Sequence, residues 1–207
     1  MPPVSTRTAP FVVLDDFLQP ELHAGLLAHA LDSEADFAAT TVQAGIGPVA
    51  NAEIRRSSHS LAGLGPFKRA FRTALEARCE EIRQALGIAP FDPVMRELDL
   101  VVHRDGGYYR PHVDTMHGGA RASSANDRLL TMVYYFHRQP RGHSGGEIAL
   151  YPFVPGSAPE RIEAADNRLV AFPAMTVHEV CTVEVPGDAW ADARFSVNCW
   201  FSRVRPE

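Results

Sequence analysis

The feature that most constrains the fold is a run of short apolar segments in the second half of the chain, separated by turns rich in Gly, Pro, Asn and Asp. No helical pattern alternates with these segments, which argues against a parallel doubly wound sheet. Many short strands of this kind favour two packed antiparallel sheets, as in a β-sandwich or jelly roll. The expected strands are residues 96–103, 109–114, 128–137, 147–152, 168–172, 178–184 and 194–204.

The first half of the chain is expected to support these strands with two helices. After a strand at 11–15, Pro20 begins the first helix, since proline is favoured in the first helical turn. A second helix begins at Pro66 and ends at Gly87. Its apolar residues recur at helical spacing and indicate core packing: Phe67, Ala70, Phe71, Ala74, Leu75, Cys79, Ile82 and Leu86.

Two segments lack any periodic pattern. Residues 40–60 read as an irregular surface loop or as a flap that closes over a substrate, and residues 115–127 read as a second mobile loop. The expected fold class is α+β, mainly β, with residues 1–207 forming a single domain. Within this domain, residues 1–95 are expected to form a helical support region and residues 96–205 a β core. The helices are expected to pack on one sheet of that core.

The composition excludes several classes of protein. Hydrophobic residues make up 45% of the chain and charged residues 22%, as in ordinary globular proteins. No apolar run approaches the roughly 20 residues of a membrane span, and the first residues lack a signal-peptide pattern. A net charge of −5 argues against a nucleic-acid-binding surface. The 3 cysteines are scattered and form no CxxC motif, which favours a reducing, cytoplasmic location.

His112-Val113-Asp114, followed later by His178, is the strongest chemical motif. An HxD pair alone is weak evidence, but this one lies in a predicted strand after a Gly106-Gly107 turn. In extended backbone the first and third side chains share a face. Two imidazoles and one carboxylate can occupy one face of an octahedral metal and leave three positions open, as in non-haem Fe(II) oxygenases. Four further histidines are not assigned to metal: His103, His117, His137 and His143.

Five segments in order resemble one family, the 2-oxoglutarate/Fe(II)-dependent dioxygenases, and within it the prolyl-4-hydroxylase-like branch. They span residues 96–203, about half of the chain. They are Tyr109-x-Pro-His112-x-Asp114, the strand from Arg128 to His137, Gly145-Gly146-Glu147-Ile148, Phe172-Pro173 followed by His178, and the strand from Arg194 to Phe201. The chain departs from the branch at His103, where a tyrosine is common, and at His137, where asparagine is usual. A longer connection at 186–192 is expected to form a hairpin tip.

The resemblance implies a double-stranded β-helix, a cupin-like jelly roll, with Fe(II), 2-oxoglutarate and O2 at one open end. Ascorbate is a further candidate cofactor. His112, Asp114 and His178 are the expected metal ligands. A guanidinium forks onto a carboxylate through two parallel hydrogen bonds, so Arg194 is expected to bind the distal carboxylate of 2-oxoglutarate. The remaining expected site residues are Tyr135, Thr131 and Tyr109 at the cosubstrate, and His103, Val180 and Trp200 as pocket residues.

Three functions fit these expectations. The first is hydroxylation of an unactivated C–H bond in a prolyl or other peptidyl residue, with succinate and CO2 as coproducts. The second is hydroxylation of a free amino acid or small metabolite. The third is a non-enzymatic, metal-binding cupin-like protein, which gives Arg194 no role. Asp114 argues against a halogenase, in which that ligand is lost to make room for halide.

Overall fold

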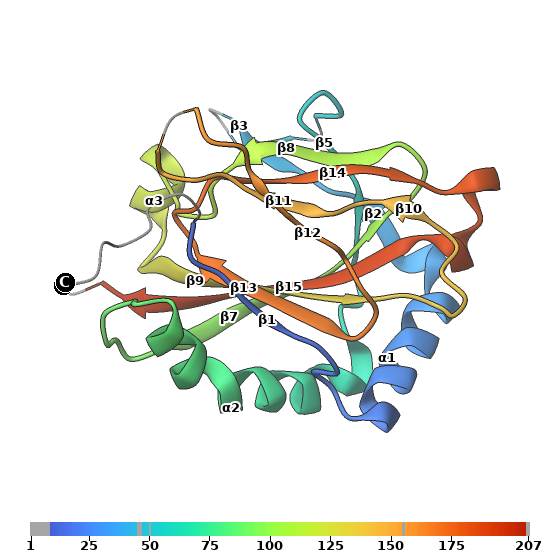
Figure 1. Ribbon diagram of the computed structural model, residues 1–207, viewed down its shortest axis with the longest axis horizontal. Coiled ribbons are helices and arrows are strands. Elements are labelled where there is room, and N and C mark those ends of the chain that lie inside the picture. Colours follow the sequence, from blue (N-terminus) through green and yellow to red (C-terminus); the bar gives the residue numbers. More distant parts are fainter. Residues whose placement is uncertain (1–8, 45–46, 50, 155, 206–207) are drawn as a thin grey trace.

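The computed structural model describes residues 9–44, 47–49, 51–154 and 156–205. Two antiparallel β-sheets face each other, and helices α1 (Pro20–Asp32) and α2 (Lys68–Ala85) cover the outer face of the larger sheet (Figure 1). A short helix, α3 (Gly118–Ser123), lies at one end of the sheets. None of the helices in the described ranges is long and apolar enough to cross a membrane.

The larger sheet has seven strands. Its order is β1 (Val12–Leu14), β13 (Arg168–Pro173), β9 (Asn126–Phe136), β15 (Arg194–Val204), β7 (Val94–His103), β6 (Ser58–Ser60) and β2 (Phe37–Ala39). The central strand, β15, pairs with β9 and β7 over almost its whole length. Every pairing in the sheet is antiparallel.

The smaller sheet runs in the order β12 (Glu160–Ile162), β11 (Ile148–Leu150), β14 (His178–Glu184), β8 (Gly107–His112) and β5 (Arg55–Arg56), with β10 (Ser144–Gly145) also paired to β14. From β7 onward the chain passes repeatedly between the two sheets. This alternation is the double-stranded β-helix, or jelly roll, that the sequence predicts. A separate ribbon joins β3 (Val42–Ala44) to β4 (Gly47–Val49).

The main hydrophobic core lies between the larger sheet and the two helices. Because side chains alternate along a strand, every second residue of β9 and β15 enters this core. Phe71, Leu75 and Ile82 of α2 pack on it and are at most 1% exposed, which confirms most of the predicted apolar stripe of that helix. Ala70 was predicted to belong to the stripe but is exposed. The sheet-facing core residues of β9 and β15 are Leu130, Met132, Tyr134, Phe136, Phe195, Val197, Cys199 and Phe201.

The other face of the larger sheet looks toward the smaller sheet and is far more polar. Its members on β9 and β15 are Thr131, Val133, Tyr135, Arg194, Ser196, Asn198 and Trp200. Cross-strand pairing places Arg194 opposite His103 of β7, and Trp200 opposite Thr131 of β9. An inward face of this composition is unsuited to plain core packing, because buried polar groups need partners. It lines the hollow described below.

The strand and helix predictions are confirmed with small shifts at the ends, but the expectations for the connections need correction. Residues 40–60 were expected to be irregular, yet β5 within them forms an edge of the smaller sheet, and β6 lies between β7 and β2 in the larger sheet. Residues 115–127 were expected to be loop and contain α3. Strand β12 was not predicted at all. Such short edge elements form through pairing with distant strands, which local sequence patterns do not register.

The connection at 186–192 is not the expected hairpin tip. It forms two 3-10 turns, Pro186–Asp188 and Trp190–Asp192. The Trp190 indole N–H donates to the carbonyls of Ala30 and Leu31 at the end of α1, at 3.2 and 3.1 Å. Its ring packs edge-on against Phe37 and Phe195. Trp190 therefore anchors the longer connection to the larger sheet and α1, while residues 186–189 stay exposed.

Candidate metal centre

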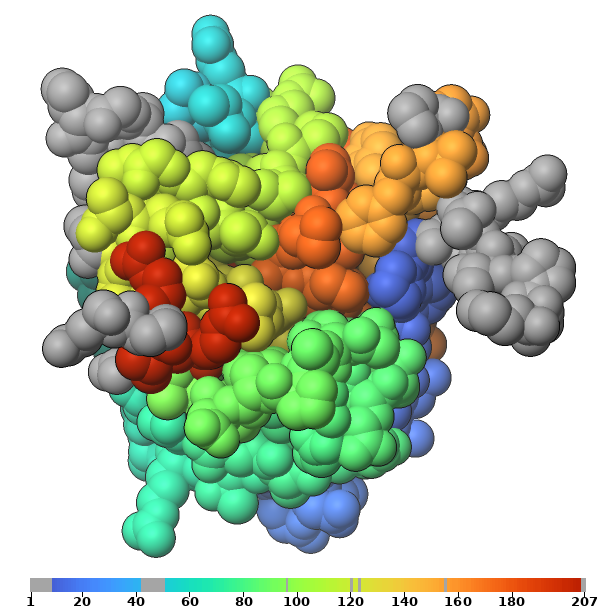
Figure 2. Space-filling view, turned by 90° about the vertical axis from the view of Figure 1, so that its left-hand side faces the viewer, coloured from blue at the N-terminus to red at the C-terminus, as the bar shows by residue number. Residues whose placement is uncertain are grey.

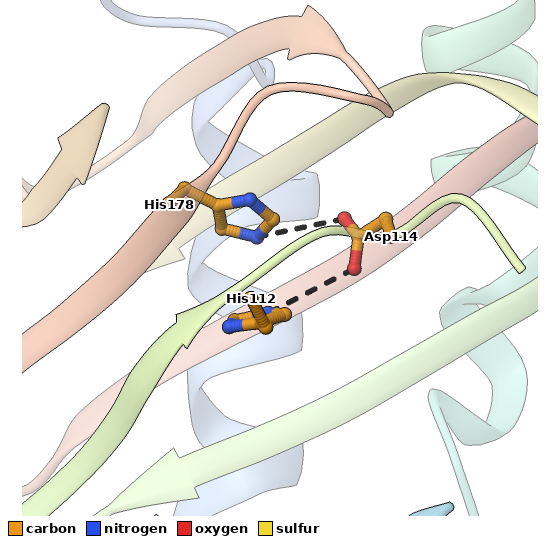
Figure 3. Close-up of side chains that lie close together, drawn as sticks. All are labelled: His112, Asp114 and His178. Atoms are coloured by element: carbon orange, nitrogen blue, oxygen red, sulfur yellow. Dashed lines mark ion pairs between the residues drawn. The ribbon is translucent and has the colours of Figure 1, made fainter. Parts of the chain in front are cut away.

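Two strands of the smaller sheet bring the three predicted metal ligands together. His112 ends β8 and is the direct antiparallel partner of His178, which begins β14. Asp114 lies two residues beyond the end of β8, where its backbone N–H donates to the Ala174 carbonyl at 2.9 Å. One ligand atom from each of the three residues lies within 4.8 Å of the others. Asp114 reaches His178 Nε2 at 3.6 Å and His112 Nε2 at 3.9 Å (Figure 3).

Both imidazoles are held in the form that a metal requires. His112 Nδ1 lies 2.8 Å from the Arg110 carbonyl, and His178 Nδ1 lies 2.9 Å from the Thr176 carbonyl. A carbonyl oxygen only accepts, so each Nδ1 carries the proton and donates. Each Nε2 then presents a lone pair to the cluster. Fixing the tautomer through the other ring nitrogen is typical of metal-binding histidines.

Protonation states within the cluster fit a cation as well. Burial and the neighbouring His178 lower the pKa of His112 to about 3, so its ring is neutral near pH 7. Burial acts to raise the pKa of Asp114, but His178 and His112 outweigh it and hold that pKa below its ordinary value. The Thr131 hydroxyl also donates to Asp114 Oδ2 at 2.8 Å. Neutral imidazole and ionised carboxylate are the forms that bind metal.

The cluster opens into a hollow of about 660 Å³ between the two sheets. On the face shown in Figure 2, the segment around α3, drawn yellow-green, lies beside the turn between β13 and β14, drawn dark orange. The backbone N–H groups of Asp114 and Thr115 join these segments by donating to the Ala174 carbonyl. All the predicted site residues line this hollow: His103, Tyr109, His112, Asp114, Thr131, Tyr135, His178, Val180, Arg194 and Trp200.

Arg194 lies in the same hollow and is the largest fully buried side chain, with 1% of its surface exposed. Its Nη1 donates to His103 Nδ1 at 3.2 Å, while its Nε has no hydrogen-bond partner among the described residues. Within the described part of the chain it forms no ion pair with a carboxylate. In the same part of the chain the buried Tyr135 hydroxyl has no hydrogen-bond partner either, and the Arg194 guanidinium carbon lies 4.6 Å from the Tyr135 ring centre. Burial raises the pKa of Tyr135 to about 12, partly offset by Arg194, so this hydroxyl remains a donor.

A buried guanidinium without a counter-ion is unfavourable by several kcal/mol. The unpaired donors of Arg194 and Tyr135 therefore fit an anionic ligand such as a carboxylate. Together with the cluster of two imidazoles and one carboxylate, the hollow offers a divalent-metal site and an anion site in one cavity. This combination suits a metal-chelating ligand that carries a second, distant carboxylate.

The other predicted residues surround the cluster in different ways. Thr131, which was expected at the cosubstrate, lines the hollow and donates to Asp114. The Tyr109 ring stacks on His112, with ring centres 3.5 Å apart, and carries the Arg55 guanidinium 4.6 Å from its centre. The Arg128 guanidinium likewise stacks over the Trp200 ring, 4.1 Å from the ring centre.

Sequence reasoning missed several residues of the hollow. Asp99, Ser196 and Asn198 line it, and so do Arg55 and Arg128. The first three could have been found, because strand period two carries the inward face from His103 back to Asp99 and from Arg194 forward to Asn198. Arg55 had no such signal, since it lies in a two-residue edge strand within a segment that lacks periodicity.

Comparison with known proteins agrees with the fold and the site. The profile of the 2OG-Fe(II) oxygenase superfamily matches residues 98–202, and the chain belongs to this family. Fe(II) and 2-oxoglutarate are the cofactors that the family and the His-Asp-His cluster imply. The chain is 28% identical over 199 residues to an uncharacterised PKHD-type hydroxylase of Synechocystis, covering 92% of this chain and 62% of that protein. It thus spans less than two thirds of that relative's length.

Solved structures share the jelly-roll fold. A prolyl-4-hydroxylase of Pseudomonas putida has a TM-score of 0.65 and 19% identity, over 96% of this chain and 95% of that one. A prolyl hydroxylase of Trichoplax adhaerens, solved with a hypoxia inducible factor peptide fragment, has a TM-score of 0.66 and 18% identity, over 94% and 84% of the two chains. At these identities the likeness establishes the fold, and it establishes nothing about the substrate.

Proposed function

We propose that the protein is an Fe(II)- and 2-oxoglutarate-dependent hydroxylase. In this proposal His112, Asp114 and His178 hold the metal, while Arg194 and Tyr135 hold the distal carboxylate of 2-oxoglutarate. The observation that carries the proposal is the buried guanidinium of Arg194, which lacks a carboxylate partner in the described chain and shares the hollow with the metal cluster. A metal-binding cupin without a cosubstrate would leave this buried charge without a purpose.

When bound, the metal and 2-oxoglutarate would supply the chemistry that activates O2, the oxidant: one oxygen atom would go to the substrate C–H bond and the other to succinate, with loss of CO2 from 2-oxoglutarate. The residues of the chain prepare the site for this chemistry. The Arg110 and Thr176 carbonyls keep both Nε2 lone pairs available, and Thr131 orients the Asp114 carboxylate. The two sheets surround the hollow and limit the access of water to the reacting groups.

A peptidyl substrate is the version of this function that we favour. Two loops beside the metal cluster expose large apolar side chains: Phe153, Val154, Met175 and Val177, each 39–62% exposed. The loops lie side by side, because the Tyr151 N–H donates to the Val177 carbonyl at 2.8 Å. Exposed apolar surface next to a site is a common mark of a protein or peptide contact. The peptide bound to the Trichoplax relative is consistent with this choice.

A free amino acid is the second candidate, and a different observation favours it. Asp99 and Arg55 both line the hollow, and neither forms an ion pair within the described ranges. Burial raises the pKa of Asp99 and lowers the pKa of Arg55, and the charge of each group partly offsets the shift of the other. A zwitterion could satisfy both groups, with its ammonium at the carboxylate and its carboxylate at the guanidinium. A peptide bond carries neither charge.

The test measures succinate formed from 2-oxoglutarate by Fe(II)-loaded protein with ascorbate, in the presence of proline-containing peptides or of free amino acids. We expect turnover by the wild type and none by Arg194→Ala. Stimulation by peptides alone would support the peptidyl function, and stimulation by free amino acids alone would support the second candidate. A wild-type protein that binds metal but neither binds nor converts 2-oxoglutarate would overturn the proposal.

A further inference from the structure

Three arginines gather around one carboxylate at the end of the sheets that carries α3. Arg121 of α3 donates from Nε to Asp127 Oδ1 at 3.0 Å and from Nη2 to Oδ2 at 3.4 Å. Arg203, near the end of β15, lies with its Nη2 3.6 Å from Asp127 Oδ2. Arg205 donates from Nη2 to the Arg121 carbonyl at 2.7 Å and also to the Ser124 carbonyl. On the face shown in Figure 2, the end of β15, drawn red, accordingly lies beside the α3 segment.

This arginine cluster, formed by Arg121, Arg203 and Arg205, carries more positive charge than its one carboxylate neutralises. A hydrogen bond from Arg121, with weaker effects of the other two, holds the pKa of Asp127 below its ordinary value, so that carboxylate is ionised. Within the described ranges no second carboxylate pairs with the cluster. Three guanidinium charges against one carboxylate leave an excess of two, in a chain whose net charge is −5. The side chains of Arg121 and Arg203 are 51% and 55% exposed, so a ligand can reach them.

The arginine cluster lies close to the hollow. His117, the residue before α3, lines the hollow, and Arg121 follows it by about one helical turn, roughly 5 Å. Asp127 and Thr131 lie four residues apart on β9, and Thr131 donates to the expected metal ligand Asp114. At about 3.3 Å per residue of strand, the cluster is therefore roughly 13 Å along the sheet from the metal ligands.

Fastening the end of β15 to α3 accounts for only part of this arrangement. Arg205 serves that purpose through its two carbonyl contacts, since cations are favourable near a helix C-terminus. Arg203 does not: at 3.6 Å it is too far from Asp127 for a hydrogen bond, and its side chain makes no other in the described part of the chain. Like charges held close together repel each other, and a bound anion relieves this repulsion.

We propose that the arginine cluster binds acidic residues of a peptidyl substrate. Glutamate and aspartate side chains complement its excess charge, and the hollow that would receive the target residue lies within reach of the same extended peptide. A peptide extends by at most about 3.3–3.6 Å per residue, so roughly 13 Å corresponds to about four residues. The acidic residues should therefore stand about four or five positions from the hydroxylated residue. This inference rests on the peptidyl form of the proposed function and names its substrate class.

The first experiment compares peptides that differ only in charge. Labelled peptides carry one central proline and two glutamates, four and five positions before or after it, and matched peptides carry glutamine or lysine there. Their binding to wild-type protein loaded with Ni(II) and 2-oxoglutarate is measured by fluorescence anisotropy. We expect a glutamate peptide to bind about three- to tenfold more tightly than its glutamine counterpart, and the lysine peptide to bind least. The preference should shrink as salt is raised, because exposed charges are screened.

The second experiment changes the charge of the protein at two places. Arg203→Glu brings the arginine cluster to two positive and two negative charges, so it should abolish the preference for glutamate. Arg69→Glu alters the net charge equally at an exposed position of α2, on the outer face of the larger sheet, and should keep the preference. Arg203→Lys retains the charge and should stay within about twofold of the wild type.

Equal binding of glutamate and glutamine peptides by the wild type at low salt would overturn the inference, and so would the absence of binding by every peptide. An equal loss of preference in Arg203→Glu and Arg69→Glu would overturn it too, because the effect would then come from net charge alone. The binding of 2-oxoglutarate is measured on the same samples. A wild type that fails to bind or convert 2-oxoglutarate would instead remove the proposed function itself, so the two failures are distinguishable.

Discussion

A hydrogen bond between Thr131 and Asp114 connects the two sheets at the metal cluster: the Thr131 hydroxyl donates to Asp114 Oδ2 at 2.8 Å. Thr131 lies on β9 of the larger sheet, and Asp114 lies just beyond the end of β8 in the smaller sheet. Thr131, which the sequence analysis expected at the cosubstrate, thus orients the Asp114 carboxylate. Partners of this kind typically tune metal affinity by 10- to 100-fold. We therefore expect Thr131→Val to weaken Fe(II) binding by about tenfold, and Thr131→Ser to restore most of it. Equal affinity of all three proteins, by anaerobic titration, would contradict this role.

Removing either imidazole should abolish stoichiometric metal binding. His112→Ala and His178→Ala each delete one of three ligands, so the loss should exceed that of Thr131→Val. The matched control is His117→Ala, because His117 lines the same hollow but lies outside the cluster. Metal content after equilibrium dialysis is the measurement. One bound metal per chain in both ligand variants would refute the assignment.

Arg194→Lys keeps the positive charge but loses the planar fork that suits a carboxylate. We expect 2-oxoglutarate affinity to fall by about 2 kcal/mol, the scale of a lost charge-assisted hydrogen bond. Metal binding should be intact, since Arg194 does not belong to the metal cluster. Calorimetric titration of the metal-loaded variant measures the change. Wild-type affinity in Arg194→Ala would rule out the anchoring role.

Gly146 makes room for Arg194, and a methyl group there should disturb cosubstrate binding. A Cβ at Gly146 would lie 2.7 Å from Arg194 Cδ and 2.9 Å from Val183 Cγ2, in backbone with φ +74°. Gly187 has a similar φ of +80°, but a Cβ there would meet nothing within 4 Å. Gly187→Ala therefore controls for backbone strain alone. We expect weaker 2-oxoglutarate binding in Gly146→Ala only, and equal binding in both variants would contradict the steric argument.

His143 should make the stability of the metal-free protein depend on pH. Burial and the neighbouring Arg141 and His137 lower its pKa to about 3 in the fold, against 6.5 for an ordinary histidine. Below pH 6.5 the unfolded chain takes up a proton that the folded chain does not. The free energy of unfolding therefore falls with falling pH, by up to about 1.4 kcal/mol per pH unit for this group.

Urea unfolding of the metal-free wild type and His143→Gln between pH 8 and 5 tests this expectation. The two stabilities should run parallel above pH 6.5, where neither state binds the proton. Below pH 6.5 the variant should lose stability less steeply than the wild type. A variant with the same slope as the wild type throughout would show that His143 does not contribute.

Alternation along the chain was sufficient to predict much of the molecule. It located β7, β8, β9, β11, β13, β14 and β15 within a few residues, and the helical spacing of Phe71, Leu75 and Ile82 placed α2 on the core. These features are local, because whether a residue faces inward depends on its immediate neighbours and their period. The HxD motif and the later histidine also indicated the metal chemistry in advance.

Only the tertiary structure decided how these local features meet. Sheet pairing places His112 opposite His178, brings Thr131 to Asp114, and carries Arg55 to the Tyr109 ring. It also leaves Arg194, Tyr135 and His103 buried with unpaired donors, which no pattern in the sequence announces. Hydrogen-bond partners and burial depend on strand register and on packing between residues far apart in the chain, so periodicity within one strand cannot specify them.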